Sequence, residues 1–220
     1  MGHCQEAQMT TLRTNAAYSW CHTVGMAAFP DELRGQRLRL CRWSLDAIDE
    51  VMVAVQDSFE ELHVWLAWAE ELPTRESLVD LIKENLLHFD ADDRWSYFLR
   101  EIDGGQLVGG ASLDRRGVID GLEIGYWVRT DRTGRGYATE ATALLTDAAF
   151  NAALDIADVR ISMDSANDAS AAVPPKVGFI FDREYERDKM APGHSGSAIA
   201  WVMTRAQWQK RWLGTNTGES

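Results

Sequence analysis

The stretch Leu122-Glu-Ile-Gly-Tyr-Trp-Val-Arg129 runs directly into Thr130-Asp-Arg-Thr-Gly-Arg-Gly-Tyr-Ala-Thr-Glu-Ala141, and it carries the strongest structural signal in the chain. Apolar side chains alternate along the first segment, which predicts a strand. The second segment contains Gly134 and Gly136 and then enters an alanine-rich run with helical spacing that reaches about Ala153. A helix start offers unpaired N–H groups and a partial positive charge, and glycines let the backbone approach an anion closely. The pattern therefore predicts a strand, a loop that can cradle a phosphate, and a helix.

Two common phosphate motifs do not fit this loop. No Gly-x4-Gly-Lys-Ser/Thr sequence is present, which excludes a P-loop. Gly134 and Gly136 could open a Gly-x-Gly-x-x-Gly dinucleotide motif, but position 139 is threonine. A meander of strands also precedes the loop, whereas a dinucleotide site normally opens a doubly wound fold. A tight turn that happens to contain two glycines is the alternative interpretation.

Strand and helix signals alternate on both sides of this segment. Strands are expected at residues 37–42, 95–102, 106–113, 122–129 and 159–163, after Gly178, and at 198–204. Helices are expected at 44–56, 60–68 and 74–87, from the glycine loop to about 153, and near Ser170. This order predicts a mixed α+β domain in which the strand–loop–helix is central.

The length of 220 residues suits one domain. We expect that domain at residues 34–208, because residues 1–33 are polar without a clear period and 209–220 form a second polar stretch. Both ends are therefore expected to be mobile tails.

Charge and composition exclude several classes of protein. With a net charge of −12, the chain lacks the basic surface that nucleic-acid binding needs. The chain contains no run of 18 apolar residues that could span a membrane, and residues 1–33 lack the pattern of a signal peptide. The 3 cysteines form neither a metal motif nor an even disulfide set, and no histidines are paired. We therefore expect a cytoplasmic protein with no nucleic-acid partner, no membrane partner and no metal.

A second cluster follows the expected strand 159–163, with Asn167-Asp-Ala-Ser170 and then Gly178-Phe179. Together with Thr133-x-x-Gly136-x-Ala138, it resembles the GCN5-related N-acetyltransferase (GNAT) family over residues 34–208. The branch that acetylates N-termini of ribosomal proteins (RimJ/RimL-like) is similar at three segments: Glu123-Ile-Gly-Tyr-Trp-Val, Gly136-Tyr-Ala-Thr-Glu-Ala141 and His63-Val-Trp65-Leu-Ala-Trp68. The resemblance implies a GNAT fold, with a mixed, mostly antiparallel twisted sheet of about six or seven strands. Helices would flank this sheet, which would be splayed at the acyl-CoA site.

Two positions depart from the family pattern. Thr133 stands where Gln or Arg is usual, with Arg132 or Arg135 as candidates for the missing charge, and Pro174-Pro175 interrupts a usually continuous short helix. Both departures would fit a non-catalytic acyl-CoA sensor, whereas the presence of Glu123 argues for an enzyme.

The resemblance implies acetyl-CoA as co-substrate. Its pyrophosphate would be held by backbone N–H groups of the loop and first helical turn, which are those of Gly134, Arg135, Gly136, Tyr137, Ala138 and Thr139. Its pantetheine arm would pair with the strand end at Trp127, Val128 and Arg129. A backbone N–H near Trp127 or Val128 would lie at the thioester oxygen, and Asn167 would hydrogen-bond a pantetheine amide.

Glu123 is the expected catalytic base. Alternation puts Glu123, Gly125, Trp127 and Arg129 on one face of the strand, where they can line a cleft. A carboxylate on a central strand is costly unless it is paired, so a salt bridge to an arginine such as Arg160 is the alternative role.

Ser170 is the expected acid for the leaving thiolate, by resemblance. A hydrogen bond to the local backbone is its alternative role. Tyr137 and Tyr185 are the other candidate acids.

The expected activity is acetyl-CoA-dependent N-acetylation of a primary amine by direct attack. The branch resemblance favours a protein N-terminal α-amine. The alternative acceptor is a small cationic amine such as an aminoglycoside-like antibiotic or a polyamine, which the acidity of the chain would suit. Trp65, Trp68 and Trp95 are candidates for the acceptor side, with core packing as the alternative, and a homodimer is left open.

Overall fold

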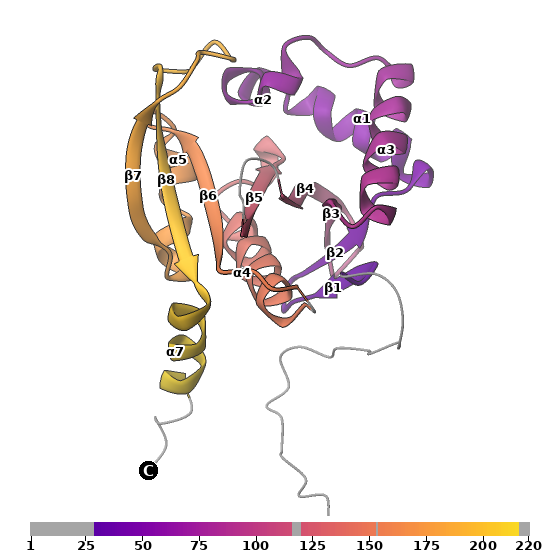
Figure 1. Cartoon of the computed structure of the whole chain (residues 1–220). Coiled ribbons are helices and arrows are strands. Elements are labelled where there is room, and N and C mark those ends of the chain that lie inside the picture. The colour runs from indigo at the N-terminus through magenta and orange to yellow at the C-terminus, as the bar shows by residue number, and fades with distance from the viewer. Residues whose placement is uncertain (1–28, 116–119, 153, 216–220) are drawn as a thin grey trace, which may run out of the picture.

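The computed structural model describes residues 29–115, 120–152 and 154–215, and its elements follow the order expected of an α+β domain (Figure 1). The strands are β1 (Glu32–Arg34), β2 (Leu38–Arg42), β3 (Arg94–Glu101), β4 (Leu107–Asp114), β5 (Gly121–Val128), β6 (Asp158–Asp164), β7 (Ile180–Glu186) and β8 (Ser197–Thr204). The helices are α1 (Ile48–Asp57), α2 (Phe59–Trp65), α3 (Arg75–Asp90), α4 (Tyr137–Asn151), α5 (Asp168–Ala171), α6 (Pro174–Val177) and α7 (Arg205–Thr215). Short 3-10 turns are η1 (Leu45–Ala47), η2 (Ala67–Ala69) and η3 (Thr130–Arg132).

The described strands form one sheet in the order β1-β2-β3-β4-β5-β6-β8-β7. Neighbouring strands are antiparallel except for β5 and β6, which are parallel. This confirms the expected mixed, mostly antiparallel sheet, but it has eight strands rather than six or seven.

The additional strand is β1, which lies partly in the expected tail 1–33, so the predicted start of the domain at residue 34 is wrong. Leu33 is buried between exposed Glu32 and Arg34, and Phe29 is buried as well. A three-residue strand with one buried side chain is too short to show a period in the sequence.

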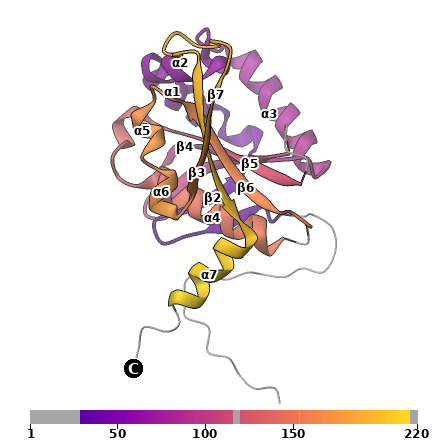
Figure 2. The same cartoon turned by 60° about the vertical axis from the view of Figure 1, so that its left-hand side comes forward.

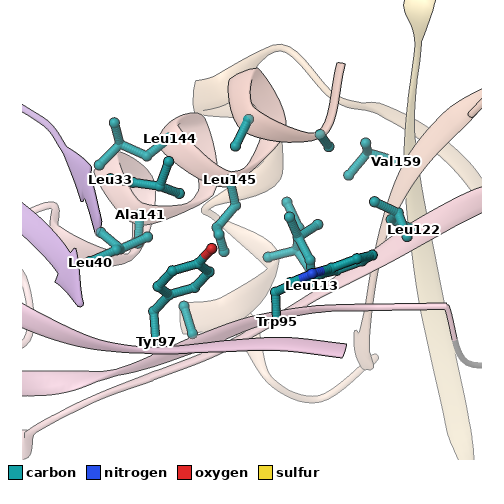
Figure 3. Close-up of a cluster of buried hydrophobic side chains, with 14 of the residues drawn as sticks. Leu33, Leu40, Trp95, Tyr97, Leu113, Leu122, Ala141, Leu144, Leu145 and Val159 are labelled. Carbon is teal, nitrogen blue, oxygen red and sulfur yellow. The ribbon is translucent and has the colours of Figure 1, made fainter. Parts of the chain in front are cut away.

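Helices cover both faces of the sheet (Figures 1 and 2). The alanine-rich α4 packs on one face, where its small side chains let it lie close to the strands, and α1 and α3 cover the other face. Strand β3 shows how alternation sorts the side chains between the two layers. Trp95 and Tyr97 point toward α4 (Figure 3), whereas Phe98 packs against α1 and α3.

The sheet opens between β5 and β6. These strands pair at only three positions, which are Gly121 with Asp158, Leu122 with Val159 and Glu123 with Arg160. Beyond Glu123, β5 stays paired with β4 and β6 stays paired with β8, but the two strands no longer pair with each other. One edge of β5 is thus left without a neighbouring strand over residues 124–128, which is the splay that the family resemblance implies.

The C-terminal boundary at residue 208 is also wrong, because α7 continues through the expected tail to residue 215. Trp208 anchors this helix by stacking on Phe150 at 5.4 Å and by donating from Nε1 to Asp147 Oδ1 at 2.7 Å. Because residues 209–220 are mostly polar, the sequence did not predict this helix, which is held to the domain by the contacts of Trp208. Residues 1–28 and 216–220 lie outside the described part of the chain.

The expected interruption by the double proline is confirmed. Helix α5 ends at Ala171, and α6 begins at Pro174 with proline at its first two positions. Prolines are tolerated there because the first N–H groups of a helix have no intrahelical partner.

Across the described ranges, no helix has both the length and the apolar character needed to cross a bilayer.

Candidate active site

The loop between β5 and α4 has the geometry of an anion cradle. Gly134 and Gly136 have φ of +72° and +79°, in the left-handed region that favours glycine, and Gly136 caps α4. Within the described chain, the backbone N–H groups of residues 134–139 have no hydrogen-bond acceptor. These unpaired donors and the positive end of α4 fit the pyrophosphate of acetyl-CoA.

The Arg37 side chain holds this loop from the β1–β2 turn. Its Nη1 donates to the Arg135 carbonyl at 2.7 Å, its Nη2 donates to the Gly136 carbonyl at 3.4 Å, and its Nε donates to Glu140 at 2.8 Å. Glu140 also accepts the backbone N–H groups of Arg37 and Leu38. In a trans peptide the N–H points opposite to the C=O, so a carbonyl that faces Arg37 turns the next N–H away from it.

Three charged or polar side chains of the loop already have partners. Thr133 Oγ1 donates to the Thr130 carbonyl at 2.9 Å and Arg135 donates to the Asp131 carbonyl at 3.3 Å, while Arg132 pairs with Asp131 and donates to Gln106 before β4. The cation that directly supports the cradle is therefore Arg37, which was not identified from the sequence because it lies 98 positions before Arg135.

At the free edge of β5, the backbone N–H of Val128 points into the gap toward β6. Arg129 N–H donates to the Val108 carbonyl at 2.8 Å, on the β4 side of the strand. Because N–H groups alternate in direction along a strand, Trp127 N–H also faces β4, while those of Tyr126 and Val128 face the gap toward β6. Of the two expected oxyanion donors, the geometry thus favours Val128.

Arg129 itself is engaged elsewhere, which does not support its expected contact with pantetheine. Its backbone N–H is bonded to β4, and its side chain pairs with Asp57 at 3.3 Å and Asp131 at 3.0 Å.

Ser170 meets Tyr126 at the gap. The Tyr126 hydroxyl lies 3.0 Å from Ser170 Oγ and donates to the Ser170 carbonyl at 3.1 Å. Burial raises the pKa of Tyr126 to about 12, so the phenol keeps its proton at neutral pH. Among the described residues, the partner of the Ser170 hydroxyl is therefore Tyr126 rather than the local backbone, which was the alternative role.

Tyr126 was missed because alternation places it among buried core residues. The two tyrosines named from the sequence lie elsewhere. Tyr137 donates its hydroxyl to Glu101, which raises the pKa of Tyr137, and Tyr185 lies on the edge strand β7.

Asn167 caps α5. Its Oδ1 accepts the Ser170 N–H at 3.0 Å, so Asn167 positions Ser170 directly. The carboxamide NH2 is then the part of Asn167 that is left to donate to a pantetheine carbonyl.

Glu123 lies at the closed end of the gap, in the last pair of β5 with β6. Its parallel neighbour Arg160 donates to Asp158 at 2.9 and 3.2 Å. That hydrogen bonding to Asp158 is the main cause that raises the pKa of Arg160, and the charge of Glu123 adds to it. The main ion-pair partner of Arg160 is therefore Asp158 rather than Glu123.

A cavity of about 450 Å³ lies between β3–β5 and the helices α1 and α3. It reaches β5 at Gly125, Tyr126 and Trp127, beside the free strand edge. Glu123 lies on the same strand face as Gly125, two residues or about 6–7 Å along the strand.

The expected aromatic wall on the acceptor side is only partly right. Trp68 lines the cavity and meets Trp127 edge-on, with ring centroids 6.2 Å apart. Trp95 is fully buried on the opposite face, against α4 and Phe29, so a substrate contact for Trp95 is wrong (Figure 3). Alternation along β3 is the reason, and the same alternation could have shown that Phe98 faces the cavity.

Trp65 lies outside the cavity lining and supports a bridge near it. Its carbonyl accepts a hydrogen bond from His194 Nε2 at 3.0 Å, and the Val64 carbonyl accepts the Gly193 N–H at 2.8 Å. These bonds join α2 to the loop between β7 and β8, two segments that lie side by side in Figures 1 and 2. Helices from the N-terminal half are thereby tied to the far side of the sheet gap.

In the described part of the chain, no group of three or more His, Cys, Asp or Glu side chains is placed to hold a metal ion.

The family model described as an acetyltransferase (GNAT) domain matches residues 37–180. The chain is 27% identical over 159 residues to the Bacillus subtilis (strain 168) protein named "Putative ribosomal N-acetyltransferase YdaF", which covers 68% of this chain and 81% of that protein.

Two solved structures share the fold. One is the microcin C7 self-immunity acetyltransferase MccE in complex with acetyl-CoA and AMP, with TM-score 0.72, 16% identity and coverage of 81% of this chain and 98% of that one. The other is RimL, a ribosomal L7/L12 α-N-protein acetyltransferase in complex with coenzyme A, with TM-score 0.71, 17% identity and coverage of 80% and 97%.

Proposed function

The chain belongs to the GNAT acetyltransferase family, and on that premise we propose that it transfers the acetyl group of acetyl-CoA to a protein or peptide N-terminal α-amine. The observation that carries the proposal is the free edge of β5, because it lies next to both a cradle for the donor and a cavity for the acceptor. The N–H cradle of α4 lies at its end, and a cavity large enough for an acceptor lies on its face. The relatives named as ribosomal-protein acetyltransferases support an α-amine and a cytoplasmic location.

The donor is held by backbone groups and by one arginine. Residues 134–139 offer N–H groups to the pyrophosphate, with Arg37 fixing their direction. The edge of β5 pairs with pantetheine, and acetyl-CoA supplies an acetyl thioester there. Val128 N–H then stabilises the charge that develops on the carbonyl oxygen, and Asn167 NH2 binds a pantetheine carbonyl.

Glu123 takes the proton from the attacking amine through a water. An α-amine with pKa about 7.7–8.0 is roughly a tenth neutral at pH 7, a cost of about 1.4 kcal/mol. A lysine with pKa about 10.4 would cost about 4–5 kcal/mol. A water-bridged carboxylate can offset the first cost more readily than the second.

The Tyr126–Ser170 pair stabilises the leaving thiolate by a hydrogen bond rather than by giving up a proton. The pKa of Tyr126 is about 12, well above the value of about 8.5 for an ordinary thiol. Full transfer from phenol to thiolate would therefore cost roughly 5 kcal/mol. Because the Tyr126 proton is donated to the Ser170 carbonyl, the donor to the thiolate is the Ser170 hydroxyl, which turns toward it from Tyr126 Oη, and solvent supplies the final proton.

The direct test is a thiol-release assay with acetyl-CoA and peptides that have free N-termini. Mass spectrometry would then locate the acetyl group on the peptide. We expect a gain of one acetyl group at the α-amine and none on internal lysines. Acetylation only of polyamines or aminoglycosides, or binding of acetyl-CoA without release of CoA in the presence of any acceptor, would contradict the proposal.

A further inference from the structure

We infer that the acceptor of this enzyme carries a bulky apolar or aromatic group beside its amine, and that this group fills the cavity between β3–β5 and α1 and α3. The inference rests on the proposed function, since it names the acceptor for that same site.

The wall is mostly apolar and rich in aromatic rings. Its apolar side chains come from the strands, the helices and the segments that connect them, and they include Trp43, Val51, Trp68, Phe98 and Trp127. Trp43 stacks on Phe98 with centroids 4.9 Å apart, and Trp68 meets Trp127 at 6.2 Å. A group that fills such a space must be apolar, because the wall offers few hydrogen bonds.

Four polar side chains of the wall form two hydrogen-bonded pairs. Arg94 Nε donates to Asp114 Oδ2 at 2.9 Å, and Ser96 Oγ donates to Asn85 Oδ1 at 2.6 Å. Asp114 is the sole carboxylate among the lining residues, and it already faces a guanidinium. A polycation would therefore find no unneutralised acidic lining, which argues against an aminoglycoside or polyamine despite the net charge of −12.

Glycines keep the cavity open next to the reacting centre. A Cβ on Gly110 would lie 2.6 Å from Trp127 Nε1, so glycine there lets the indole lie against β4 as part of the wall. A Cβ on Gly125 would lie 3.3 Å from Ser112 Oγ on the cavity side. The cavity thus begins at β5 itself, beside the edge that faces the acyl donor.

The volume of about 450 Å³ falls in the usual range of about 300–1,000 Å³ for small-molecule sites. The hydroxymethyl or methyl group of an N-terminal serine or alanine would leave most of this space unfilled. A benzyl, indolylmethyl or isobutyl group would contact the wall, and differences of this kind change kcat/KM by roughly tenfold or more.

Two sources can supply this chemistry, a peptide N-terminus or a free arylalkylamine. The experiment compares peptides that differ only at the first residue (Phe, Trp, Leu, Ala or Ser) with phenethylamine, tryptamine and spermidine. It measures kcat/KM by CoA release, and it measures peptide binding by calorimetry in the presence of CoA. We expect the Phe, Trp and Leu peptides to exceed the Ala and Ser peptides at least tenfold in both readouts, and spermidine to be inactive. Higher kcat/KM for the peptides than for the free arylalkylamines identifies the source as an N-terminus, and the reverse identifies a small amine.

A variant that shrinks the cavity tests the inference, and a matched variant on the exposed side of the same helix is its control. Val51→Phe adds a ring to a lining residue of α1, whereas Val53→Phe adds the same ring to a residue that is 50% exposed on the same helix. Val51→Phe should abolish the preference for bulky first residues, and Val53→Phe should keep it. Gly125→Ala adds a single methyl group on the cavity side and tests the same point if Val51→Phe does not fold.

The outcomes separate this inference from the proposed function. Faster transfer to Ala, Ser or spermidine than to Phe would overturn the inference, and the transfer to Ala or Ser peptides would leave the proposed function in place. Tight binding of the Phe peptide without any turnover would support the inference and contradict the proposed function. Equal binding of all peptides without turnover would overturn both.

Discussion

The hydroxyl of Tyr126 on β5 lies 3.0 Å from Oγ of Ser170 on α5, two residues that are 44 positions apart in the chain. The contact joins the two sides of the gap in the sheet, because α5 follows β6. Asn167 holds Ser170 from behind through the cap of α5. A serine whose hydroxyl is held by a buried phenol has a defined direction, which a serine on a short exposed helix would otherwise lack.

Because of this contact, we expect Tyr126→Phe and Ser170→Ala to slow the same step, the departure of the thiolate. A hydrogen bond to a developing charge contributes about 1.5–3 kcal/mol, so each variant should lose roughly ten- to a hundredfold in kcat. The double variant should be no slower than the slower single variant, since the two groups act as a unit. Steady-state kinetics with acetyl-CoA affinity measured in parallel checks this. Losses that multiply, or a loss of acetyl-CoA binding equal to the loss of rate, would contradict a shared role.

Glu123→Gln should slow transfer most at neutral pH. At pH 7 the α-amine is mostly protonated, so removal of the base should lower kcat/KM at least tenfold. Above pH 8 the amine is increasingly neutral without help, so the gap between variant and parent should narrow toward pH 9. The measurement is a pH–rate profile from 6.5 to 9.5, with the affinity for acetyl-CoA as the control. A constant ratio across this range would show that Glu123 is not the base.

Arg37→Ala should weaken binding of CoA but not that of its pantetheine part. The guanidinium fixes the carbonyls of Arg135 and Gly136, so its loss frees the loop whose N–H groups face the pyrophosphate. We expect a rise of about tenfold in the dissociation constant of CoA, equivalent to about 1.4 kcal/mol, measured by calorimetry.

The controls for this variant use a nearby arginine and a shorter ligand. Arg34→Ala removes an exposed arginine at the end of β1, whose contact to Glu32 is 4.0 Å long, and should leave the dissociation constant unchanged. Pantetheine, which lacks the pyrophosphate, should bind parent and Arg37→Ala alike. Equal weakening of both ligands would mean that Arg37 acts on the fold rather than on the cradle.

The C-terminal helix makes a prediction about stability. Trp208→Ala removes the stacking on Phe150 and the hydrogen bond to Asp147, and should lower the free energy of unfolding by about 1–3 kcal/mol. Gln209→Ala, one position along on the exposed side of the helix, should change it by less than about 0.5 kcal/mol. Urea denaturation followed by circular dichroism measures both. Equal stability of the Trp208 variant and the parent would show that residues beyond 208 behave as a tail.

Local patterns predicted the order of elements well, because most of these strands and helices carry their own periodicity. The β5–loop–α4 unit could be located from Gly134 and Gly136 and from the alternation of 122–129 alone. What could not be predicted depends on contacts between distant segments. Arg37 and Tyr126 have side chains whose roles are set by partners that are 98 and 44 positions away.

The tryptophans also show that local patterns do not predict contacts between distant segments. Trp68 and Trp95 are both aromatic residues near polar segments, but the pleat of β3 turns Trp95 into the core under α4. Trp43 and Trp127 reach the cavity from segments that are 84 positions apart, and no local pattern joins them. The fold could be predicted because it follows from local signals and a family resemblance, whereas the acceptor side is assembled from many separate segments.

Gly193→Ala should disturb acceptor binding through the bridge between α2 and the β7–β8 loop. A Cβ at this position would lie 2.5 Å from Val64 Cγ1 and 2.7 Å from the Val64 carbonyl oxygen, which is backbone and cannot rotate away. The loop must therefore leave α2, with loss of the bonds from Gly193 to Val64 and from His194 to Trp65. Because α2 leads into Leu66 and Trp68 of the cavity wall, we expect KM for the peptide to rise several-fold while KM for acetyl-CoA stays the same. Gly104→Ala, at a φ of +82° with open space around it, destabilises the chain through backbone strain rather than a clash, far from the bridge, and serves as the control. A rise in peptide KM that Gly104→Ala reproduces would assign the effect to general destabilisation, and an unchanged peptide KM in Gly193→Ala would show that the bridge does not shape the acceptor site.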